Sequence, residues 1–216
     1  MLITYNGHSE FLLETGNVFR ILTDPYDSHV GYKMTDEKAD CVLVSHQHAD
    51  HNYVAKVKGE PVVVSTPGVY SVGPGVTVTA IESDHDDVMG SQRGKTLLFV
   101  VEAEGLRVAH LGDLGRNLNE SEIKALGHID ILMIPVGGFF TIYALTAREI
   151  VRKLNPNVVI PMHYRTSVNA SWPIDDVKKF MGAMDALEVQ PMPLIRITAG
   201  DLRQQPPVCL LQPSNL

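Results

Sequence analysis

The sequence predicts an α+β (α/β) fold, a four-layer αββα sandwich in which two β-sheets pack together and helices cover their outer sides. Most of the chain reads as short segments rich in Val, Ile and Leu, separated by turns such as Asn6-Gly7 and Gly16-Asn17. After residue 136, helical and strand patterns alternate. The 216 residues show no break in composition, so we expect one domain spanning residues 1–216.

The strands are predicted from their apolar residues and from the turn residues that bound them. In chain order they cover residues 2–5, 11–14, 18–23, 39–45, 61–65, 76–81, 95–102, 106–110, 129–136, 158–161 and 194–198. Residues 54–58, 120–126, 147–154 and 175–187 have helical character. Thr146 is placed to cap the third of these helices, with Glu149 completing a capping box. The proline-rich tail from Gln204 is expected to be an edge or a loosely attached segment.

Composition excludes several classes of protein. Hydrophobic residues make up 44% of the chain and charged residues 20%, which is typical of globular proteins. No apolar run approaches the ~20 residues of a membrane span, and no secretory signal is visible at the start. A net charge of −7 disfavours nucleic-acid and anionic-membrane partners. Two cysteines, Cys41 and Cys209, cannot form a disulfide framework, so we expect a cytoplasmic location.

The strongest functional motif is His46-Gln47-His48-Ala49-Asp50-His51, which directly follows an apolar strand. In extended chain, residues two apart point to the same side, so His46 and His48 can bind one cation. If a helix begins at Ala49, Asp50 and His51 point toward a neighbouring cation. Nitrogen and carboxylate ligands suit zinc, and a site without Cys is typical of an open, catalytic metal. The alternative is a polar loop whose histidines only cap the strand end.

Further polar residues follow four other predicted strands. These residues are Asp24, His85, Asp113 and His163. Each of them alone would be read as part of a solvated turn. Polar groups at strand ends along one edge of a sandwich can converge, and with the histidine motif they favour a common site.

Together these residues resemble the metallo-β-lactamase superfamily. That family has an Asp after an early strand, then His-x-His-x-Asp-His, then a His, an Asp and a His in that order, and the likeness extends from residue 2 to 163. The resemblance implies two zinc ions, with manganese or iron as alternatives. It places the first ion on His46, His48 and His85, the second on Asp50, His51 and His163, with Asp113 between them. It also implies that Asp24 orients a ligand imidazole.

A narrower resemblance rests on segments 7–11, 110–114 and 160–166, which read Gly-His-Ser-Glu-Phe, His-Leu-Gly-Asp-Leu and Ile-Pro-Met-His-Tyr-Arg-Thr. They are similar to a branch of small proposed zinc-dependent hydrolases. This branch is related to ascorbate-6-phosphate lactonase and to a phospholipase D acting on N-acyl-phosphatidylethanolamines. The likeness implies the fold and the metal site but no substrate.

Three assignments stay open at this point. His85 is flanked by Asp84 and Asp86, which could compete with it as ligands. His110 is a rival for the third nitrogen of the first ion, although the order of the motifs favours His85. His8 either supports the ligands from the turn after the first strand or bonds only to backbone.

The expected function is hydrolysis of an ester, lactone, amide or phosphodiester bond in a small molecule, by a hydroxide shared between two zinc ions. Asp50 would orient this hydroxide, and Asp50, His110 or His8 would supply a proton to the leaving group. Phe140 and Thr141 are candidate substrate contacts, as is Arg165, which could bind a phosphate or carboxylate. Trp172 is a candidate for the pocket rim.

Three alternatives remain. They are a diiron redox protein, although such proteins prefer Glu where Gln47 stands, a nucleic-acid processing enzyme, and a non-catalytic metal-binding protein. The sequence leaves homo-oligomer formation open.

Overall fold

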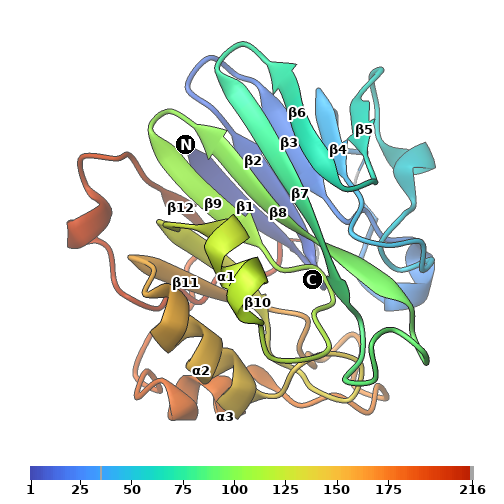
Figure 1. Cartoon of the computed structure of the whole chain (residues 1–216), viewed down its shortest axis with the longest axis vertical. Helices are drawn as coiled ribbons and strands as arrows, with labels where there is room; N and C mark the ends of the chain where they lie inside the picture. Colours follow the sequence, from blue (N-terminus) through green and yellow to red (C-terminus); the bar gives the residue numbers. More distant parts are fainter. Residues whose placement is uncertain (35, 215–216) are drawn as a thin grey trace.

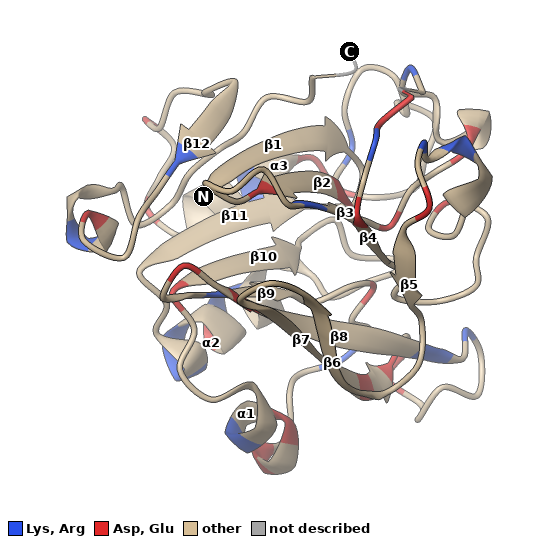
Figure 2. Cartoon of the chain, turned by 90° about the horizontal axis from the view of Figure 1, so that it is seen from above, with Lys and Arg blue, Asp and Glu red and all other residues tan. Residues whose placement is uncertain are grey.

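The computed structural model describes residues 1–34 and 36–214 and contains two six-stranded β-sheets that pack against each other (Figure 1). The first sheet contains, in spatial order, β12 (Leu194–Arg196), β1 (Leu2–Gly7), β2 (Glu10–Glu14), β3 (Arg20–Thr23), β4 (Cys41–Leu43) and β5 (Val62–Val64). The second contains β11 (Val158–Met162), β10 (Ile131–Pro135), β9 (Leu106–His110), β8 (Lys95–Ala103), β7 (Val76–Asp84) and β6 (Gly68–Gly73). Seen from above, the sheets form two layers whose strands carry few charged residues (Figure 2).

Parallel pairing in each sheet places several strand ends at one edge. β3, β4 and β5 are parallel neighbours in the first sheet, and β9, β10 and β11 are parallel neighbours in the second. Parallel strands run in the same direction, so their carboxyl ends meet at the same edge of the sheet. The polar residues that follow these strands are therefore gathered by the topology.

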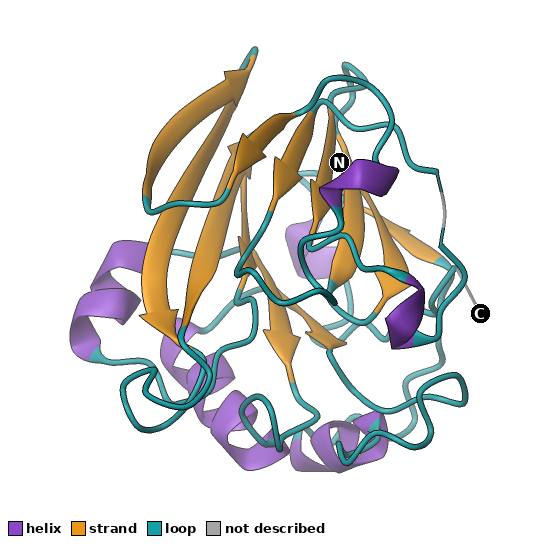
Figure 3. Ribbon diagram, turned by 90° about the vertical axis from the view of Figure 1, so that its right-hand side faces the viewer, coloured by secondary structure: helices purple, strands orange, loops and turns teal. Residues whose placement is uncertain are grey.

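The core lies between the sheets and under the helices. Apolar side chains of both sheets form one buried cluster that includes Ile3, Leu13, Val100 and Ile134. The helices α1 (Glu120–Leu126) and α2 (Ala144–Leu154) contact β7 and β10 of the second sheet, and α3 (Val177–Ala183) packs on α2. A short 3₁₀ segment, Val54–Lys56, covers the outer side of the first sheet. The predicted layered α+β sandwich is confirmed, with strands at the centre and helices mostly around them (Figure 3).

The helices differ from the prediction at three places. α2 begins at Ala144 after Tyr143, so Thr146 lies inside its first turn and the predicted capping box is wrong. A capping box forms instead on α1, where the Asn119 side chain accepts the Glu122 N–H at 2.9 Å and Glu122 accepts the Asn119 N–H at 2.8 Å. α3 covers only part of the predicted helix 175–187, and the segment predicted as a helix at 54–58 is the 3₁₀ turn.

One strand was not anticipated. β6 is an edge strand with Gly68 and Gly73 at its ends, and its Val69 side chain is 72% exposed, so its apolar pattern is weak. The tail lies at the edge of the second sheet, which is one of the two arrangements expected for it. Val208 and Leu211 are buried, Val208 forms a parallel bridge with Val159, and the Cys209 N–H donates to the Val159 carbonyl at 2.9 Å. Among the described residues, no helix is both long enough and apolar enough to span a membrane.

Candidate metal centre

The segment from His46 to His51 follows β4 as a series of turns. The predicted helix at Ala49 is absent, and the His51 N–H donates instead to the His48 carbonyl at 3.0 Å in a tight turn. This turn still sends successive polar side chains in two directions. His46 and His48 point to one group of potential ligands, and Asp50 and His51 point to another.

The first ligand group contains three histidines from two strand ends. His46 and His48 follow β4, and His85 follows β7. One nitrogen from each ring lies within 4.8 Å of the others, and the ring centroids are 4.5 to 5.1 Å apart. The structure therefore gathers the three nitrogens that the sequence predicts for one ion.

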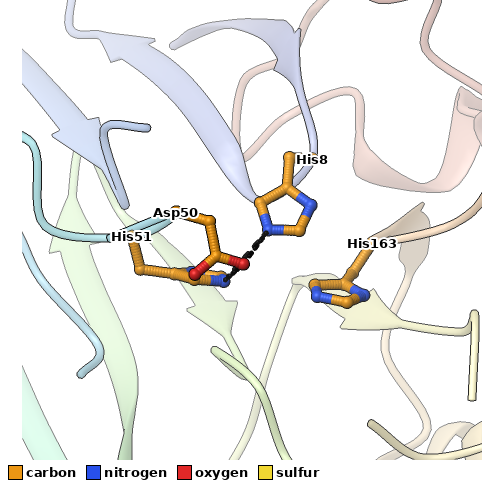
Figure 4. A group of neighbouring side chains, drawn as sticks. All are labelled: His8, Asp50, His51 and His163. Atoms are coloured by element: carbon orange, nitrogen blue, oxygen red, sulfur yellow. Dashed lines mark hydrogen bonds and ion pairs between the residues drawn. The ribbon is translucent and has the colours of Figure 1, made fainter. Parts of the chain in front are cut away.

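The second ligand group contains His8, Asp50, His51 and His163, whose potential ligand atoms also lie within 4.8 Å of one another (Figure 4). His8 Nε2 is 3.2 Å from Asp50 Oδ2 and 3.1 Å from His51 Nε2. The sequence predicts that His8 supports the ligand residues or bonds only to backbone. The structure places its ring nitrogen among them, and burial lowers the pKa of His8 to about 4, with His163 adding to this effect.

Asp113 lies between the two groups. Its Oδ2 is 3.3 Å from His51 Nε2 and 3.2 Å from His163 Nε2 in the second group, and 3.5 Å from His85 Nε2 in the first. Gly112, at φ +49°, permits this approach, because a Cβ there would lie 2.6 Å from Thr96 Oγ1 and 2.7 Å from the Leu97 carbonyl. One carboxylate oxygen thus contacts both groups.

Asp24, which follows β3, orients two of these imidazoles. Its carboxylate accepts hydrogen bonds from the Ser45 N–H at 2.7 Å, from the Ser45 hydroxyl at 2.7 Å and from His51 Nδ1 at 3.0 Å. Ser45 Oγ in turn lies 2.9 Å from His46 Nδ1. Because the Nδ1 atoms are used in this way, the Nε2 atoms of both rings face the ligand groups as lone-pair donors.

These donors fit a metal. His46 Nε2 is buried and has no hydrogen-bond partner among the described residues. Burial, with the neighbouring His51, holds the pKa of His46 well below its usual range, so this ring is neutral at pH 7. Neutral imidazoles and carboxylates without thiolates are the ligand set of zinc and similar divalent ions. The residues present therefore fit the ions that the sequence implies.

His110 does not reach either group, which corrects its expected roles as ligand and proton donor. Its Nε2 donates to the Ser9 carbonyl at 2.9 Å, and its Nδ1 accepts the Gly112 N–H at 3.2 Å. Both ring nitrogens are thus used by backbone. The first group is completed by His85, as the motif order favoured.

The carboxylates on either side of His85 are also occupied. Asp84 pairs with Lys95 and accepts from Arg116 Nε at 2.6 Å. Asp86 accepts four backbone N–H groups at 2.7 to 2.9 Å. Neither carboxylate belongs to a ligand group among the described residues, so the predicted competition with His85 does not arise.

A cavity of about 560 Å³ opens beside the two groups. It is lined by His48, Asp50, His85, Asp113 and His163 from these groups, and by His29, Ala49, Arg93, Phe140, Ser171, Trp172 and Pro173. Phe140 and Trp172 thus lie where the sequence suggested. Thr141 lines an adjacent cavity of about 350 Å³, which Phe140 and Arg93 also border.

The sequence suggested Arg165 as the cationic residue at the cavity wall, but the structure places Arg93 there. Arg165 is exposed and lines neither of these cavities, so it is not brought to the ligand groups. Arg93 lines both, although no motif pointed to it. Its position follows from how the loop after β7 folds back, which no local pattern encodes.

Comparison with known proteins agrees with this arrangement. Residues 2–163 match the family model of the beta-lactamase superfamily domain. A metal-dependent hydrolase of the UPF0173 group from Pelotomaculum thermopropionicum is 30% identical over 218 residues, covering 86% of this chain and 92% of that protein. One from Archaeoglobus fulgidus is 29% identical over 196 residues, covering 77% and 84%. A crystal structure of a proposed zinc-dependent hydrolase of the metallo-β-lactamase superfamily from Thermotoga maritima superposes with a TM-score of 0.79, at 34% identity, over 97% of each chain.

Proposed function

The chain belongs to the metallo-β-lactamase superfamily, and on this premise we propose that it is a zinc-dependent hydrolase with a binuclear centre. The proposed reaction is cleavage of an ester, lactone or phosphodiester-type bond in a small-molecule substrate. The observation that carries the proposal is the position of Asp113, whose one oxygen contacts two ligand groups at the wall of a cavity. Metal-dependent hydrolases among the relatives support the same reaction class.

The ligands divide between two ions. His46, His48 and His85 would hold one ion, the group containing His8 and Asp50 would hold the other, and Asp113 would contact both. Zinc suits these nitrogen and oxygen donors, and manganese or iron are alternatives. Two such ions acidify water and polarise the bond under attack.

Asp50 is the chain's own candidate for handling the proton. It lines the cavity, and its side chain is 25% exposed. Burial would raise the pKa of Asp50, but the neighbouring His8 and His51 lower it, so the carboxylate is ionised at neutral pH. It can therefore orient an attacking water by accepting a hydrogen bond from it, and a proton that it takes up is readily given to the leaving group. Phe140 and Trp172 would exclude bulk water from the same cavity.

The cellular setting is proposed from weaker observations. Cys41 and Cys209 are both buried as free thiols, which supports a reducing compartment, and we place the protein in the cytoplasm. The net charge of −7 supports a small molecule rather than a nucleic acid as substrate.

The double variant Asp50→Ala, His51→Ala tests this function. We expect it to lose bound zinc and turnover together, because it removes two ligands of one ion. Turnover is measured on 4-nitrophenyl butyrate, a γ-lactone and bis(4-nitrophenyl) phosphate, before and after chelation and zinc addition. His128→Ala is the control, since His128 is exposed and its side chain pairs with Asp130 at the opposite strand end. Full turnover in the double variant would sink the proposal.

His8 provides a sharper prediction. Its Nε2 lies within 3.2 Å of two other ligand atoms, which is the spacing of donors that share one ion, so we expect it to bind the second ion directly. His8→Ala should weaken binding of the second zinc ion by at least about tenfold and leave binding of the first unchanged. Stepwise competition with a chromophoric chelator measures both binding constants. Two stepwise constants equal to those of the wild type would show that His8 is not a ligand.

A further inference from the structure

We propose that the substrate carries an anionic group, a carboxylate or a phosphate, that Arg93 binds at the wall of the cavity. This inference rests on the proposed function, because it names the class of substrate for the same site. It replaces Arg165, which the sequence suggested for this role and which the structure leaves exposed outside the cavity.

Arg93 lies at the wall of the cavity that borders both ligand groups. Among the described residues, it is the only Lys or Arg that lines the cavity of about 560 Å³, where it shares the wall with His48, His85 and Asp113. Its guanidinium carbon lies 5.7 Å from the centroid of the Phe140 ring. This distance is within the range of a cation–π contact, which uses the charge of the guanidinium and none of its N–H donors as hydrogen-bond donors to a polar acceptor. These donors are therefore available to a molecule in the cavity.

Arg93 also lacks an internal anion. Within the described part of the chain, no carboxylate lies within 4.0 Å of its guanidinium, and no hydrogen bond involves its side chain. By contrast, the nearby Arg116, also half-buried, pairs with both Asp84 and Glu122. A half-buried guanidinium without a partner is costly unless a bound anion compensates it.

The loop around Asp86 holds the backbone of Arg93 in place before any ligand binds. The buried carboxylate of Asp86 accepts the backbone N–H groups of Val88, Gly90, Gln92 and Arg93 itself, at 2.7 to 2.9 Å. Preorganisation of this kind reduces the entropy cost of binding.

The chemistry of the wall then defines the substrate. The carboxylates of Asp50 and Asp113 belong with the ligand groups and would face the ions, so Arg93 is the cationic side chain of the wall that a substrate can contact. A guanidinium binds a carboxylate or a phosphate through two parallel hydrogen bonds. Phe140 and Trp172 offer aromatic surface beside it. We therefore expect an anion joined to an apolar or aromatic part.

The experiment titrates three probes into the zinc-loaded protein by calorimetry. Phenyl phosphate and benzoate carry the two anions on the same ring, and benzyl alcohol is the neutral counterpart. Arg93→Ala should raise the Kd of at least one anion about tenfold. The anion whose Kd rises more shows whether the substrate carries a phosphate or a carboxylate. Benzyl alcohol should bind both proteins equally, and Arg165→Ala, the matched control, should bind all three probes as the wild type does.

The outcomes separate this inference from the proposed function. Zinc content is measured on the same samples, and Arg93→Ala should retain it. An unchanged anion Kd in Arg93→Ala, an equal loss in Arg165→Ala, or a wild type that binds neither anion would overturn the inference. A wild type that takes up no zinc contradicts the proposed function instead. The same titration of the metal-free protein then still decides the role of Arg93.

Discussion

Replacement of Asp113 by Asn is expected to reduce bound zinc from about two ions per chain to at most about one. The Asp113 carboxylate is the negative charge within 3.5 Å of His51, His85 and His163, and an amide cannot serve two cations in its place. Turnover should fall at least about a hundredfold, because a pair of ions contributes several kcal/mol to the transition state and each ~1.4 kcal/mol is tenfold. Elemental mass spectrometry and the hydrolysis rate measure the two effects.

A matched substitution keeps this result interpretable. Asp130 is also buried and accepts the Arg107 N–H at 2.8 Å, but it precedes β10 and so lies at the opposite strand end. Asp130→Asn should lower the melting temperature without loss of zinc. If Asp113→Asn binds two ions as tightly as the wild type does, the Asp113 carboxylate does not hold the two ions.

Substitution of Asp24 by Ala is expected to weaken zinc binding by about 10- to 100-fold, although Asp24 is outside the ligand groups. Its carboxylate holds His51 through Nδ1 and, through Ser45, also holds His46. Without it, both rings lose the orientation that directs Nε2 to the ions. The loss of a buried acceptor should also cost about 1–3 kcal/mol of unfolding free energy, because the Ser45 N–H is left unpaired.

Asp24→Asn separates the two effects. An amide oxygen still accepts from the Ser45 N–H, but the amide nitrogen cannot accept from His51 Nδ1. We expect this variant to regain most of the stability while zinc binding stays weak, as shown by thermal unfolding and chelator competition. Zinc affinity at the wild-type level in both variants would contradict the orienting role of Asp24.

The site residues that the sequence predicts are those that follow the ends of apolar strands. His46, His85, Asp113 and His163 each follow an apolar strand, and the parallel pairing of β9 to β11 and of β3 to β5 brings such ends together. A local sequence pattern reveals each of these ends. Their number and order therefore indicated the fold and the ligand types before the structure did.

The remaining features depend on contacts between distant segments. His8 reaches the second group because it adopts φ +57° and its carbonyl accepts the His163 N–H at 2.8 Å, across 155 positions. His110 is held away from the ligand groups because its Nε2 bonds to the carbonyl of Ser9, which lies 101 positions away in the sequence. Arg93 is placed by a loop folded around Asp86. No spacing in the sequence predicts such contacts, so the positions of these three residues could not be derived from local patterns.

The metal content of the purified chain tests the central claim most directly. Elemental mass spectrometry is performed on protein prepared without chelators or a histidine tag, beside the His48→Ala variant. The account predicts about two zinc ions per wild-type chain and fewer in the variant, because His48 belongs to the first ligand group. Two iron ions would contradict the zinc assignment and favour diiron chemistry. A wild type that holds no metal, even after incubation with zinc or manganese, would contradict the binuclear centre and the hydrolase proposal.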